Sequence, residues 1–385
     1  MKYIKDYKIN NKKVILRCDL NVSIKDGKII DDTKIIKSLD TINYLIENNN
    51  SIIILSHLGK IKSETDKEKN TLYPVYLKLK ELLNNTVYFS KTTRGKELED
   101  IASNLKEKEI LLIENTRFED FPEKLESGCN LELSKYWASL GDIFVNDAFG
   151  TSHRRHASNY GIKKYLDSYY GILINEELTK LKELTVNPKK PFTVIMGGAK
   201  VDDKLALIEE MLKECDKLIV GGGIANTFLL AENYNIGSSL SNKDYIPQIK
   251  QILTNYKDKI IIPTDFYVEN NGIKKYRKIN EIENNDIIYD IGTISLKEYE
   301  VIINDSNTIF LNGTVGLYEN ENYAYGTKEL LSILKKSNKK VFIGGGDAVT
   351  ATNKLGYSDS FYYKSTGGGA TLEYIIEKKL IALED

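Results

Sequence analysis

Arginine and histidine are scarce in this chain, and most of them lie in its first half. Of 54 Lys and Arg residues only six are arginines, and all three histidines precede residue 160. A guanidinium group can bind carboxylate or phosphate in a bidentate manner, which an ammonium group cannot do. These residues therefore predict a basic pocket for a small ligand with several negative charges. Its candidate members are Arg17, His57, Arg117, His153 and Arg154, with Asp19 and Asn21 beside them at a strand end.

His153 and His156 have a second interpretation, because a pair of histidines can bind a metal ion. Arg154 and Arg155 lie between them in the sequence and would repel a cation. The metal site is the weaker of the two interpretations.

Two lysines in the second half follow a pair of glycines. In the segment 197–214, Gly197 and Gly198 end an apolar run, and a helical stretch follows. Lys200 and Lys204 are four residues apart, so we expect them on one face of the first helical turn. An anion bound at the helix N-terminus would lie between them. Chance spacing in a Lys-rich chain is the alternative.

Three further turns repeat the order of apolar run, glycines and helix, at 221–226, 344–350 and 365–371. Glycine lets backbone N–H groups approach a phosphate or a flat base closely. Together these turns predict a nucleotide site. None matches GxGxxG or GxxxxGK[ST], which disfavours a Rossmann dehydrogenase and a P-loop enzyme. Asp347 in the second turn is either a helix N-cap or a Mg²⁺ ligand beside phosphates.

Short apolar runs that alternate with helix-period stretches must position these residues. Such runs indicate parallel strands buried on both faces, and hence doubly wound α/β sheets, in which ligands bind beyond the carboxyl ends of the strands. The stretch 170–192 has a helical pattern closed by two prolines. We expect an N-terminal domain over 1–170, a connecting helix over 171–190 and a C-terminal domain over 191–370. The apolar runs are 14–21, 51–60, 109–118, 141–150, 192–200, 217–226, 259–266, 308–316, 340–348 and 361–370.

Composition excludes several classes of protein. A length of 385 residues is enough for about two to three domains, each with its own core. The net charge of −1 argues against a general nucleic-acid binder. No apolar run approaches the roughly 18 residues of a membrane span, and the first residues have no signal-peptide core. The three cysteines are far apart and odd in number, which is typical of a reduced, cytoplasmic protein.

The order and spacing of the motifs resemble the phosphoglycerate kinase family nearly end to end. The segments that carry the resemblance are VILRCDLNV, DDTKI, SHLGK, LLIENTRF, VNDAFGTSHRRHAS, GGAKVDDK, GGGIANTF, LNGTVGLYE, GGGDAVTAT and STGGGATLE. The resemblance implies two doubly wound, Rossmann-like domains joined by a hinge helix across a cleft, with the tail 371–385 returning to the first domain. It implies phosphoryl transfer between 1,3-bisphosphoglycerate and ADP, giving 3-phosphoglycerate and ATP, with Mg²⁺ as cofactor and a monomeric enzyme.

The resemblance also assigns roles to residues. For the phosphoglycerate it implies Asp19, Leu20, Asn21, Lys34, His57, Leu58, Gly59, Lys60, Arg117, His153 and Arg154. For the nucleotide it implies Gly198, Ala199, Lys200, Lys204, Gly221, Gly222, Gly292, Asn312, Glu319, Gly345, Gly346, Asp347 and Ala348, with Asp347 holding the metal. The implied catalytic residues are Lys34, Lys200 and Gly346. The acceptor is a carboxylate with a pKa of about 4, so no general base is needed.

The chain departs from the family pattern at seven positions. Lys34 is the most serious departure, because it stands where the family has a catalytic arginine, and it keeps the charge but loses the bidentate fork. The others are Lys60 for arginine, Thr293 and Thr314 for proline, Leu311 for tryptophan, Ala348 for threonine and Tyr363 for histidine.

Two other functions remain open from the sequence. The departures suit a non-catalytic nucleotide-binding homologue, which would bind ADP without turnover. An NAD-dependent dehydrogenase is the remaining alternative, and the missing GxGxxG motif argues against it.

Overall fold

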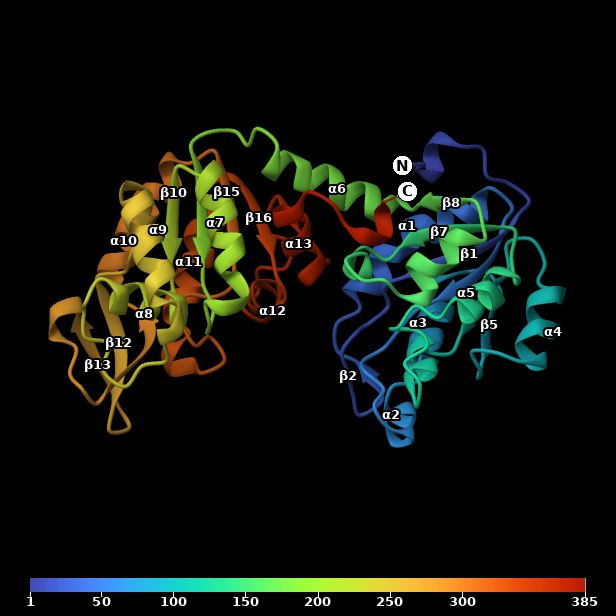
Figure 1. Cartoon of the computed structure of the whole chain (residues 1–385), viewed down its shortest axis with the longest axis horizontal. Helices are drawn as coiled ribbons and strands as arrows, with labels where there is room; N and C mark the ends of the chain where they lie inside the picture. The colour runs from blue at the N-terminus through green and yellow to red at the C-terminus, as the bar shows by residue number, and fades with distance from the viewer. Residues whose placement is uncertain (385) are drawn as a thin grey trace. The chain divides into compact units, whose positions relative to one another are not determined.

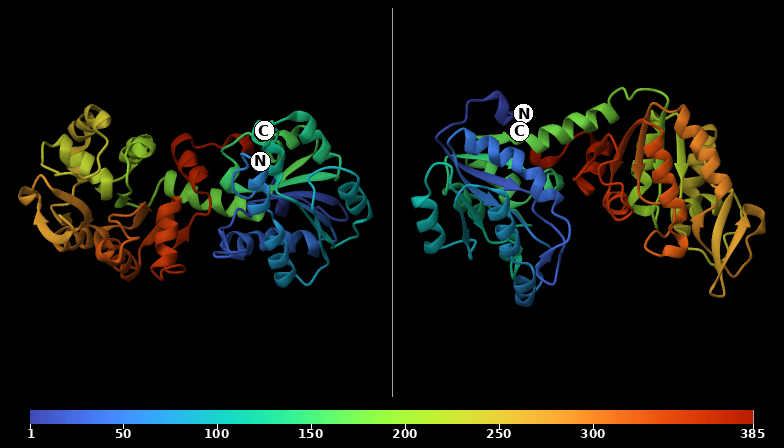
Figure 2. Two further views of the ribbon diagram at one scale, coloured as in Figure 1. Left: turned by 90° about the horizontal axis from the view of Figure 1, so that it is seen from below. Right: turned by 180° about the vertical axis from the view of Figure 1, so that it is seen from behind.

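The computed structural model describes residues 1–384 and divides the chain into two compact units. The N-terminal unit comprises Met1–Thr179 together with the residues from Glu377 onward, and the C-terminal unit comprises Lys180–Ile376. Each unit is built on a sheet with helices on both faces (Figures 1 and 2). The doubly wound α/β class predicted from the sequence is confirmed.

The sheet of the N-terminal unit has six strands in the order β5-β6-β4-β1-β7-β8, and every pairing is parallel. The four apolar runs predicted in this half all form strands, and β5 and β8 are additional. The strands are β1 (Lys13–Cys18), β4 (Ser51–Leu55), β5 (Val87–Ser90), β6 (Ile110–Ile113), β7 (Ile143–Asp147) and β8 (Ser168–Tyr170). A short hairpin of β2 (Ile24–Lys25) and β3 (Lys28–Ile29) lies outside this sheet.

Alternate residues of these strands enter two separate cores, because successive side chains of a strand point to opposite faces. Val14 and Leu16 of β1 pack in the core that includes helices α1 (Thr33–Glu47) and α3 (Tyr73–Leu82). Ile15 packs in the other core, with α4 (Lys96–Asn104) and α5 (Leu131–Ala138). A strand buried on both faces has no polar side, which is why these runs are continuously apolar.

The main sheet of the C-terminal unit is also parallel, with the order β11-β10-β9-β15-β16-β17. Its strands are β9 (Phe192–Met196), β10 (Lys217–Val220), β11 (Ile260–Ile261), β15 (Thr308–Asn312), β16 (Lys340–Gly344) and β17 (Tyr363–Lys364). All six coincide with predicted runs. The helices are α7 (Leu205–Glu214), α8 (Gly222–Ala231), α9 (Ile246–Tyr256), α10 (Thr293–Asp305), α11 (Tyr325–Lys336), α12 (Gly346–Lys354) and α13 (Gly369–Glu377).

A second, antiparallel sheet in this unit was not predicted. It has the order β13-β12-β14, and its strands are β12 (Asp265–Asn270), β13 (Ile273–Lys278) and β14 (Asp286–Ile291). Strand β13 has the sequence IKKYRK and is largely exposed, so it carries no core-facing alternation that sequence reasoning could detect. Phe266, Val268 and Ile288 of the other two strands pack against α8 through Leu229.

Helix α6 (Ile172–Thr185) contains the boundary between the two units. Within the N-terminal unit, Asp147 Oδ1 accepts a hydrogen bond from the Ile174 backbone N–H at 3.1 Å. Within the C-terminal unit, Glu183 accepts hydrogen bonds from Lys340 Nζ at 3.1 Å and from the Tyr362 hydroxyl at 2.9 Å. Each half of the helix is therefore anchored to the unit that contains it.

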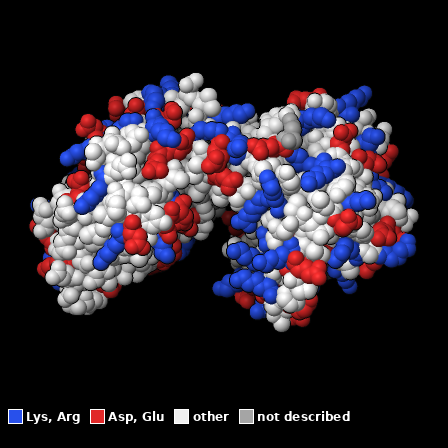
Figure 3. All heavy atoms as spheres, in the orientation of Figure 1, with Lys and Arg blue, Asp and Glu red and all other residues white. Residues whose placement is uncertain are grey.

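None of the helices formed by residues 1–384 combines the length and the apolar character that a bilayer span requires. Lysine and arginine are interspersed with aspartate and glutamate over the visible surface of both units (Figure 3).

Candidate functional site

The carboxyl ends of four neighbouring strands carry the predicted residues of the N-terminal unit. Asp19 and Asn21 follow β1, His57 follows β4, Arg117 follows β6, and the segment 149–154 follows β7. Since β6, β4, β1 and β7 are consecutive in a parallel sheet, these ends meet along one edge. The sheet topology thus brings together residues as far apart in the sequence as Asp19 and Arg154, which are separated by 135 positions.

Arg17 lies at the centre of this group and is fully buried. Its Nε donates to Ser158 Oγ at 2.8 Å, and its Nη2 lies 3.2 Å from His57 Nδ1. The same serine donates to Glu126, from its Oγ to Oε1 at 2.5 Å and from its N–H to Oε2 at 2.9 Å. Arg17 was expected to line the pocket, but its guanidinium is committed to the interior, where it supports the residues that do.

The three histidines next to the arginines are held neutral. Burial, followed by the charge of Arg17, lowers the pKa of His57 well below its usual value. Burial and Arg154 lower the pKa of His153 to about 4, and burial with the charges of Arg17, Arg117 and Arg154 lowers that of His156 to about 3. At neutral pH the imidazoles therefore offer hydrogen bonds, and the positive charge comes from arginine and lysine.

Asp19 and Lys34 form an ion pair, with Lys34 Nζ 2.9 Å from Asp19 Oδ2. Burial alone would raise the pKa of Asp19, but the charges of Lys34 and Arg17 and the hydrogen bond from Lys34 act against it, and the pKa is lowered. The carboxylate is ionised at neutral pH. Lys34, which replaces an arginine of the family pattern, thus keeps its charge next to the other predicted residues.

The loop after β4 is held by two asparagines. Asn21 Oδ1 accepts from the Gly59 backbone N–H at 2.9 Å. Asn115 accepts from the Leu58 N–H at 3.1 Å and donates from Nδ2 to the Leu58 carbonyl at 2.7 Å. Sequence reasoning missed Asn115; its position directly after β6, two residues before Arg117, was the available signal. Lys60, at the end of this loop, is exposed.

Arg117 and Arg154 differ in their surroundings. Arg117 is buried, and its Nη1 lies 3.2 Å from Asp120 Oδ2, but its Nε is buried without a hydrogen-bond partner. Arg154 is exposed, with its Nε 3.0 Å from His153 Nε2. A buried guanidinium N–H without a partner is costly and is satisfied when an anion binds. Arg117 Nε is thus an unsatisfied donor among the residues of the predicted basic pocket.

The C-terminal unit contains a cavity of about 250 Å³. Its polar wall includes five residues of the predicted nucleotide set, which are Gly198, Ala199, Gly222, Glu319 and Asp347. The remaining predicted residues do not line it: Lys200, Lys204, Gly221, Gly292, Asn312, Gly345, Gly346 and Ala348. The rest of the wall is mainly apolar and comes partly from the antiparallel sheet, with Leu240, Phe266, Ile288, Val315 and Leu317 among its residues.

Gly222 is required where two loops meet at this cavity. Its φ is +60°, and a Cβ there would lie 2.8 Å from the Gly198 carbonyl oxygen. Any other residue would force the loop after β9 away from the start of α8. The glycines predicted from the sequence therefore keep the cavity wall thin and rich in backbone groups.

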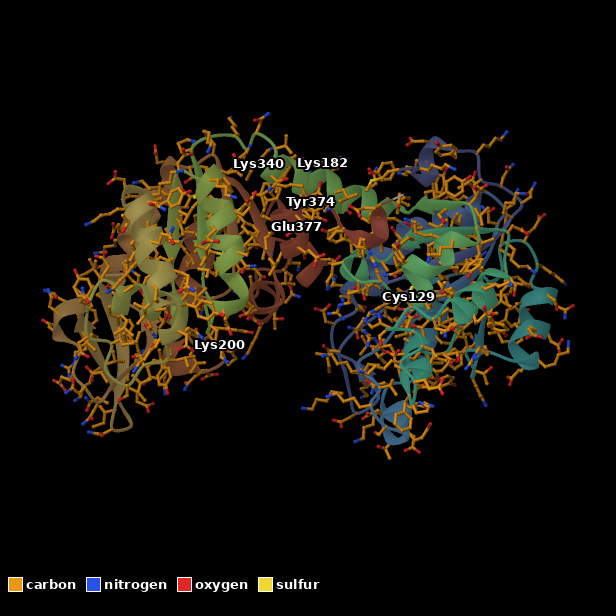
Figure 4. All side chains as sticks on the ribbon, viewed as in Figure 1. Cys129, Lys182, Lys200, Lys340, Tyr374 and Glu377 are labelled. Atoms are coloured by element: carbon orange, nitrogen blue, oxygen red, sulfur yellow. The ribbon has the colours of Figure 1, made fainter. Side chains whose placement is uncertain are left out.

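Lys200 and Lys204 do not share a helical face, which corrects the expectation from their spacing. Helix α7 begins at Leu205, after a 3₁₀ turn over Asp202–Lys204, so Lys200 lies in the loop before it and is exposed (Figure 4). Lys204 is partly buried and donates from Nζ to the Gly197 carbonyl at 2.7 Å. Burial lowers the pKa of Lys204, although Asp347 and Asp203 act against this. Lys204 supports the loop, and Lys200 is the more exposed of the two charges.

Asp347 is not a helix N-cap, so that interpretation is wrong. The N-cap of α12 is Gly345, with φ of +89°, and Asp347 is an exposed residue of the first turn. Asn312 is buried behind the same turn and donates from Nδ2 to the Gly344 carbonyl at 2.8 Å, while its Oδ1 has no partner. Ala348 packs in the hydrophobic core, and Gly292 is the N-cap of α10.

No group of three or more histidine, cysteine, aspartate or glutamate residues that could hold a metal is present among residues 1–384. Mg²⁺ needs fewer protein ligands when it binds with a nucleotide, since one or two carboxylates plus phosphate oxygens and water complete its shell. Asp347, exposed and on the cavity wall, fits that requirement.

Comparison with known proteins gives a consistent result. The profile of the phosphoglycerate kinase family matches residues 4–378. The phosphoglycerate kinase of Fusobacterium nucleatum is 44% identical over 391 residues, covering 100% of this chain and 98% of that protein. The phosphoglycerate kinase of Enterococcus faecalis is 43% identical, covering 99% of this chain and 98% of that protein.

Solved structures agree. Phosphoglycerate kinase from Coxiella burnetii has a TM-score of 0.86 at 34% identity, and covers 99% of this chain and 97% of its own. The phosphoglycerate kinase from Pyrococcus horikoshii has a TM-score of 0.85 at 30% identity, and covers 100% of this chain and 98% of its own.

Proposed function

The chain belongs to the phosphoglycerate kinase family, and we propose how its own residues divide the family's reaction between them. That reaction is reversible phosphoryl transfer from 1,3-bisphosphoglycerate to ADP, giving 3-phosphoglycerate and ATP. One observation carries the proposal: each unit presents its unusual residues at the carboxyl ends of its parallel strands, arginine and histidine in one unit and glycine in the other.

The basic pocket of the N-terminal unit would hold the phosphoglycerate. Asp19 and Asn21 would bind its hydroxyl and carboxyl end, and Arg117 and Arg154 its phosphate, with His57 donating hydrogen bonds. The support is the unpartnered Nε of Arg117 and the neutral state of His57. Leu20, Leu58, Gly59, Lys60 and His153 would complete the pocket.

The cavity of the C-terminal unit would hold ADP. The glycine-rich wall would face the phosphates and the sugar, Glu319 would bind the ribose hydroxyls, and the apolar wall would enclose the base. The support is the composition of the wall: backbone and carboxylate groups on one part, aliphatic and aromatic groups on the other. Gly345, Gly346 and Asn312 would lie near the phosphates without lining the cavity.

Catalysis in this proposal rests on position and charge. The oxygen that accepts the phosphoryl group from ATP belongs to a carboxylate, already ionised at neutral pH, so no residue needs to remove a proton. Lys200, exposed on its loop, would follow the transferring group, and Lys34 would neutralise charge from the other side. When bound, Mg²⁺ would be held by Asp347 with the nucleotide phosphates and would neutralise their charge.

Transfer requires the two substrates to approach each other, since they bind different units. We propose that the segment 171–190, most of which forms α6, acts as the hinge. The proposed domains are 1–170 with the tail 371–385, and 191–370; the contacts of α13 instead place the part of the tail before Glu377 in the C-terminal unit. We also propose a monomer in the cytoplasm, as the resemblance to the family and the three free cysteines suggest.

An assay of ATP formation from 1,3-bisphosphoglycerate and MgADP tests the proposal directly. We expect turnover that falls when either Arg117 or Lys200 is replaced by alanine. Binding of ADP with no turnover would instead favour the non-catalytic homologue. Only the departures from the family pattern, such as Lys34, support that alternative. Lys34 retains its charge within the pocket, which favours an active enzyme.

A further inference from the structure

A chain of hydrogen bonds runs through the interior of the N-terminal unit and ends at His57. Arg17 Nε donates to Ser158 Oγ at 2.8 Å, and its Nη1 donates to the Cys18 carbonyl. Arg17 Nη2 lies 3.2 Å from His57 Nδ1. Behind the arginine, Ser158 Oγ donates to Glu126 Oε1 at 2.5 Å. Arg17, Ser158 and Glu126 are all fully buried, so any part they have in binding a ligand is indirect.

The order of donors and acceptors in this chain is fixed. A serine hydroxyl has one proton, and Ser158 gives it to Glu126, which leaves a lone pair to accept from Arg17 Nε. The Ser158 N–H also donates to Glu126, to its Oε2 at 2.9 Å, and holds the carboxylate in place. Because the guanidinium is bonded at Nε and Nη1, its Nη2 stays beside His57.

This arrangement selects one tautomer of His57. The nitrogens of a guanidinium group are donors only, so His57 Nδ1 must accept and carries no proton. Burial and the charge of Arg17 lower the pKa of His57 well below its usual value, so the ring is neutral at neutral pH. The single N–H of a neutral imidazole is then at Nε2.

His57 Nε2 is the ring nitrogen that remains for a ligand. It makes no hydrogen bond to the part of the chain that the structure describes, and it is not among the unpaired atoms that are shut off from solvent. His57 follows β4 at the edge where Asp19 follows β1 and Arg117 follows β6. An Nε2–H there donates to a carboxylate or phosphate oxygen, whereas the other tautomer would present a lone pair to the anion.

We propose that Arg17, held by Ser158 and Glu126, is a positioning residue that fixes His57 as a hydrogen-bond donor to the phosphoglycerate through Nε2. Arg17 acts on binding through His57 and does not contact the substrate. This inference rests on the proposed binding of the phosphoglycerate by His57.

Nitrogen-15 NMR of the native chain tests the tautomer without any variant. Protein labelled in its histidines gives signals from three residues only, and the loss of one set in His57→Gln assigns those of His57. We expect a protonated Nε2 and an unprotonated Nδ1 from pH 8 to pH 6. The opposite tautomer, or an imidazolium at pH 7, would overturn the inference.

Arg17→Met/Glu126→Gln removes the donor to Nδ1 without leaving a buried charge. We expect His57 to populate both tautomers in this variant, and KM for 3-phosphoglycerate in the ATP-consuming direction to rise about tenfold. KM for ATP should not change, because the nucleotide binds the other unit. Arg94→Met is the control, since Arg94 is an exposed arginine of the same unit that pairs with Glu119. It should leave the tautomer and both KM values unchanged.

The His57→Gln background separates a positioning role from a general structural one. A glutamine amide nitrogen donates whatever lies behind it, so Arg17→Met/Glu126→Gln should raise KM for 3-phosphoglycerate much less in this background than in the native chain. An equal rise in both backgrounds would show that Arg17 acts by another route, and the inference would be wrong. No turnover by the native chain would instead contradict the proposed function, and the NMR result does not depend on turnover.

Discussion

The two candidate sites are built in opposite ways. In the N-terminal unit, charged and polar side chains are buried and hydrogen-bonded to one another, as Arg17 is to Ser158 and His57. In the C-terminal unit, the polar wall is mostly glycine backbone, and the charged residue closest to the proposed chemistry, Lys200, is exposed on a loop. The proposed binding residues Asp19, His57 and Arg117 of the first unit are buried within its fold, whereas the proposed catalytic Lys200 of the second unit is exposed on a loop. A substitution in the N-terminal site should therefore change activity and stability together, whereas one in the C-terminal site should change activity alone. We call the first the coupled site and the second the separable site.

Replacing Lys200 by alanine tests the separable site and should have the largest effect. We expect kcat to fall on the order of 10²–10³-fold, because a charge aimed at the transferring group is lost, with an unchanged melting temperature. Lys213→Ala is the control, since Lys213 is an exposed lysine on α7 that pairs with Glu210. A drop in melting temperature for Lys200→Ala, but not for Lys213→Ala, would show that activity and stability are not separable at Lys200.

Replacing Arg17 by methionine tests the coupled site. We expect the free energy of unfolding to fall by about 3–5 kcal/mol, because Glu126 would remain buried without its positive neighbour. Denaturant unfolding measures the loss. Adding Glu126→Gln should recover part of it, because the unpaired charge is then removed. If Arg17→Met is as stable as the native protein, Arg17 does not stabilise the fold, and activity and stability are not coupled in the N-terminal site.

Lys34→Arg tests whether the lysine at this position limits the activity of the N-terminal site. Lys34 keeps the charge of the family's arginine but offers no bidentate fork, so we expect the arginine variant to raise kcat by up to about tenfold. Steady-state assays at saturating substrates measure it. No increase would mean that the pocket, including the Lys34–Asp19 ion pair, has adapted to lysine.

A buried aspartate in each unit gives an effect on stability that depends on pH. Burial raises the pKa of both Asp147 and Asp290 to about 7. A carboxyl group with a raised folded-state pKa stabilises the fold below its unfolded pKa, and this contribution is lost as the pH rises through about 7. Relative to the native protein, Asp147→Asn should gain about 2–3 kcal/mol of stability between pH 5 and pH 8, because each unit of rise in pH up to the folded-state pKa of about 7 costs the native protein about 1.4 kcal/mol.

Asp290→Asn should behave differently and serves as the contrast. Both Asp290 oxygens accept backbone N–H groups, so an amide nitrogen would face a donor and destabilise the unit at both pH values. Thermal unfolding at pH 5 and pH 8 measures all three proteins. A pH-independent difference between Asp147→Asn and the native protein would show that Asp147 does not titrate in this range.

Sequence reasoning succeeded best where the polar residues are rare. Arg117, His57 and Asp19 stand out at the ends of apolar runs, and a parallel sheet necessarily brings such ends to one edge. It failed where local spacing was taken as a helix: Lys200 and Lys204 are four apart, but the chain forms a loop and a 3₁₀ turn before α7. Local contacts such as the hydrogen bond from Lys204 to the Gly197 carbonyl hold this segment in a loop. The spacing of two lysines alone is too short a pattern to predict a helix there.

The apolar part of the nucleotide cavity could not be predicted at all. Leu240, Phe266 and Ile288 look like any other core residues in the sequence, and the antiparallel sheet that carries two of them has no clear alternation in β13. Nothing local distinguishes an apolar side chain that contacts a ligand from one that contacts its own core.

The fold class and the available chemistry can be inferred from the order of residues alone, because buried parallel strands need continuous apolar runs and because guanidinium and glycine have uses that few other groups share. Tertiary contacts determine which hydrogen-bonding groups find partners within the protein and which remain unpaired. Hydrogen-bond partners come from distant segments, so Arg17 is satisfied by a serine 141 positions away, while Asn226 keeps one acceptor unpaired.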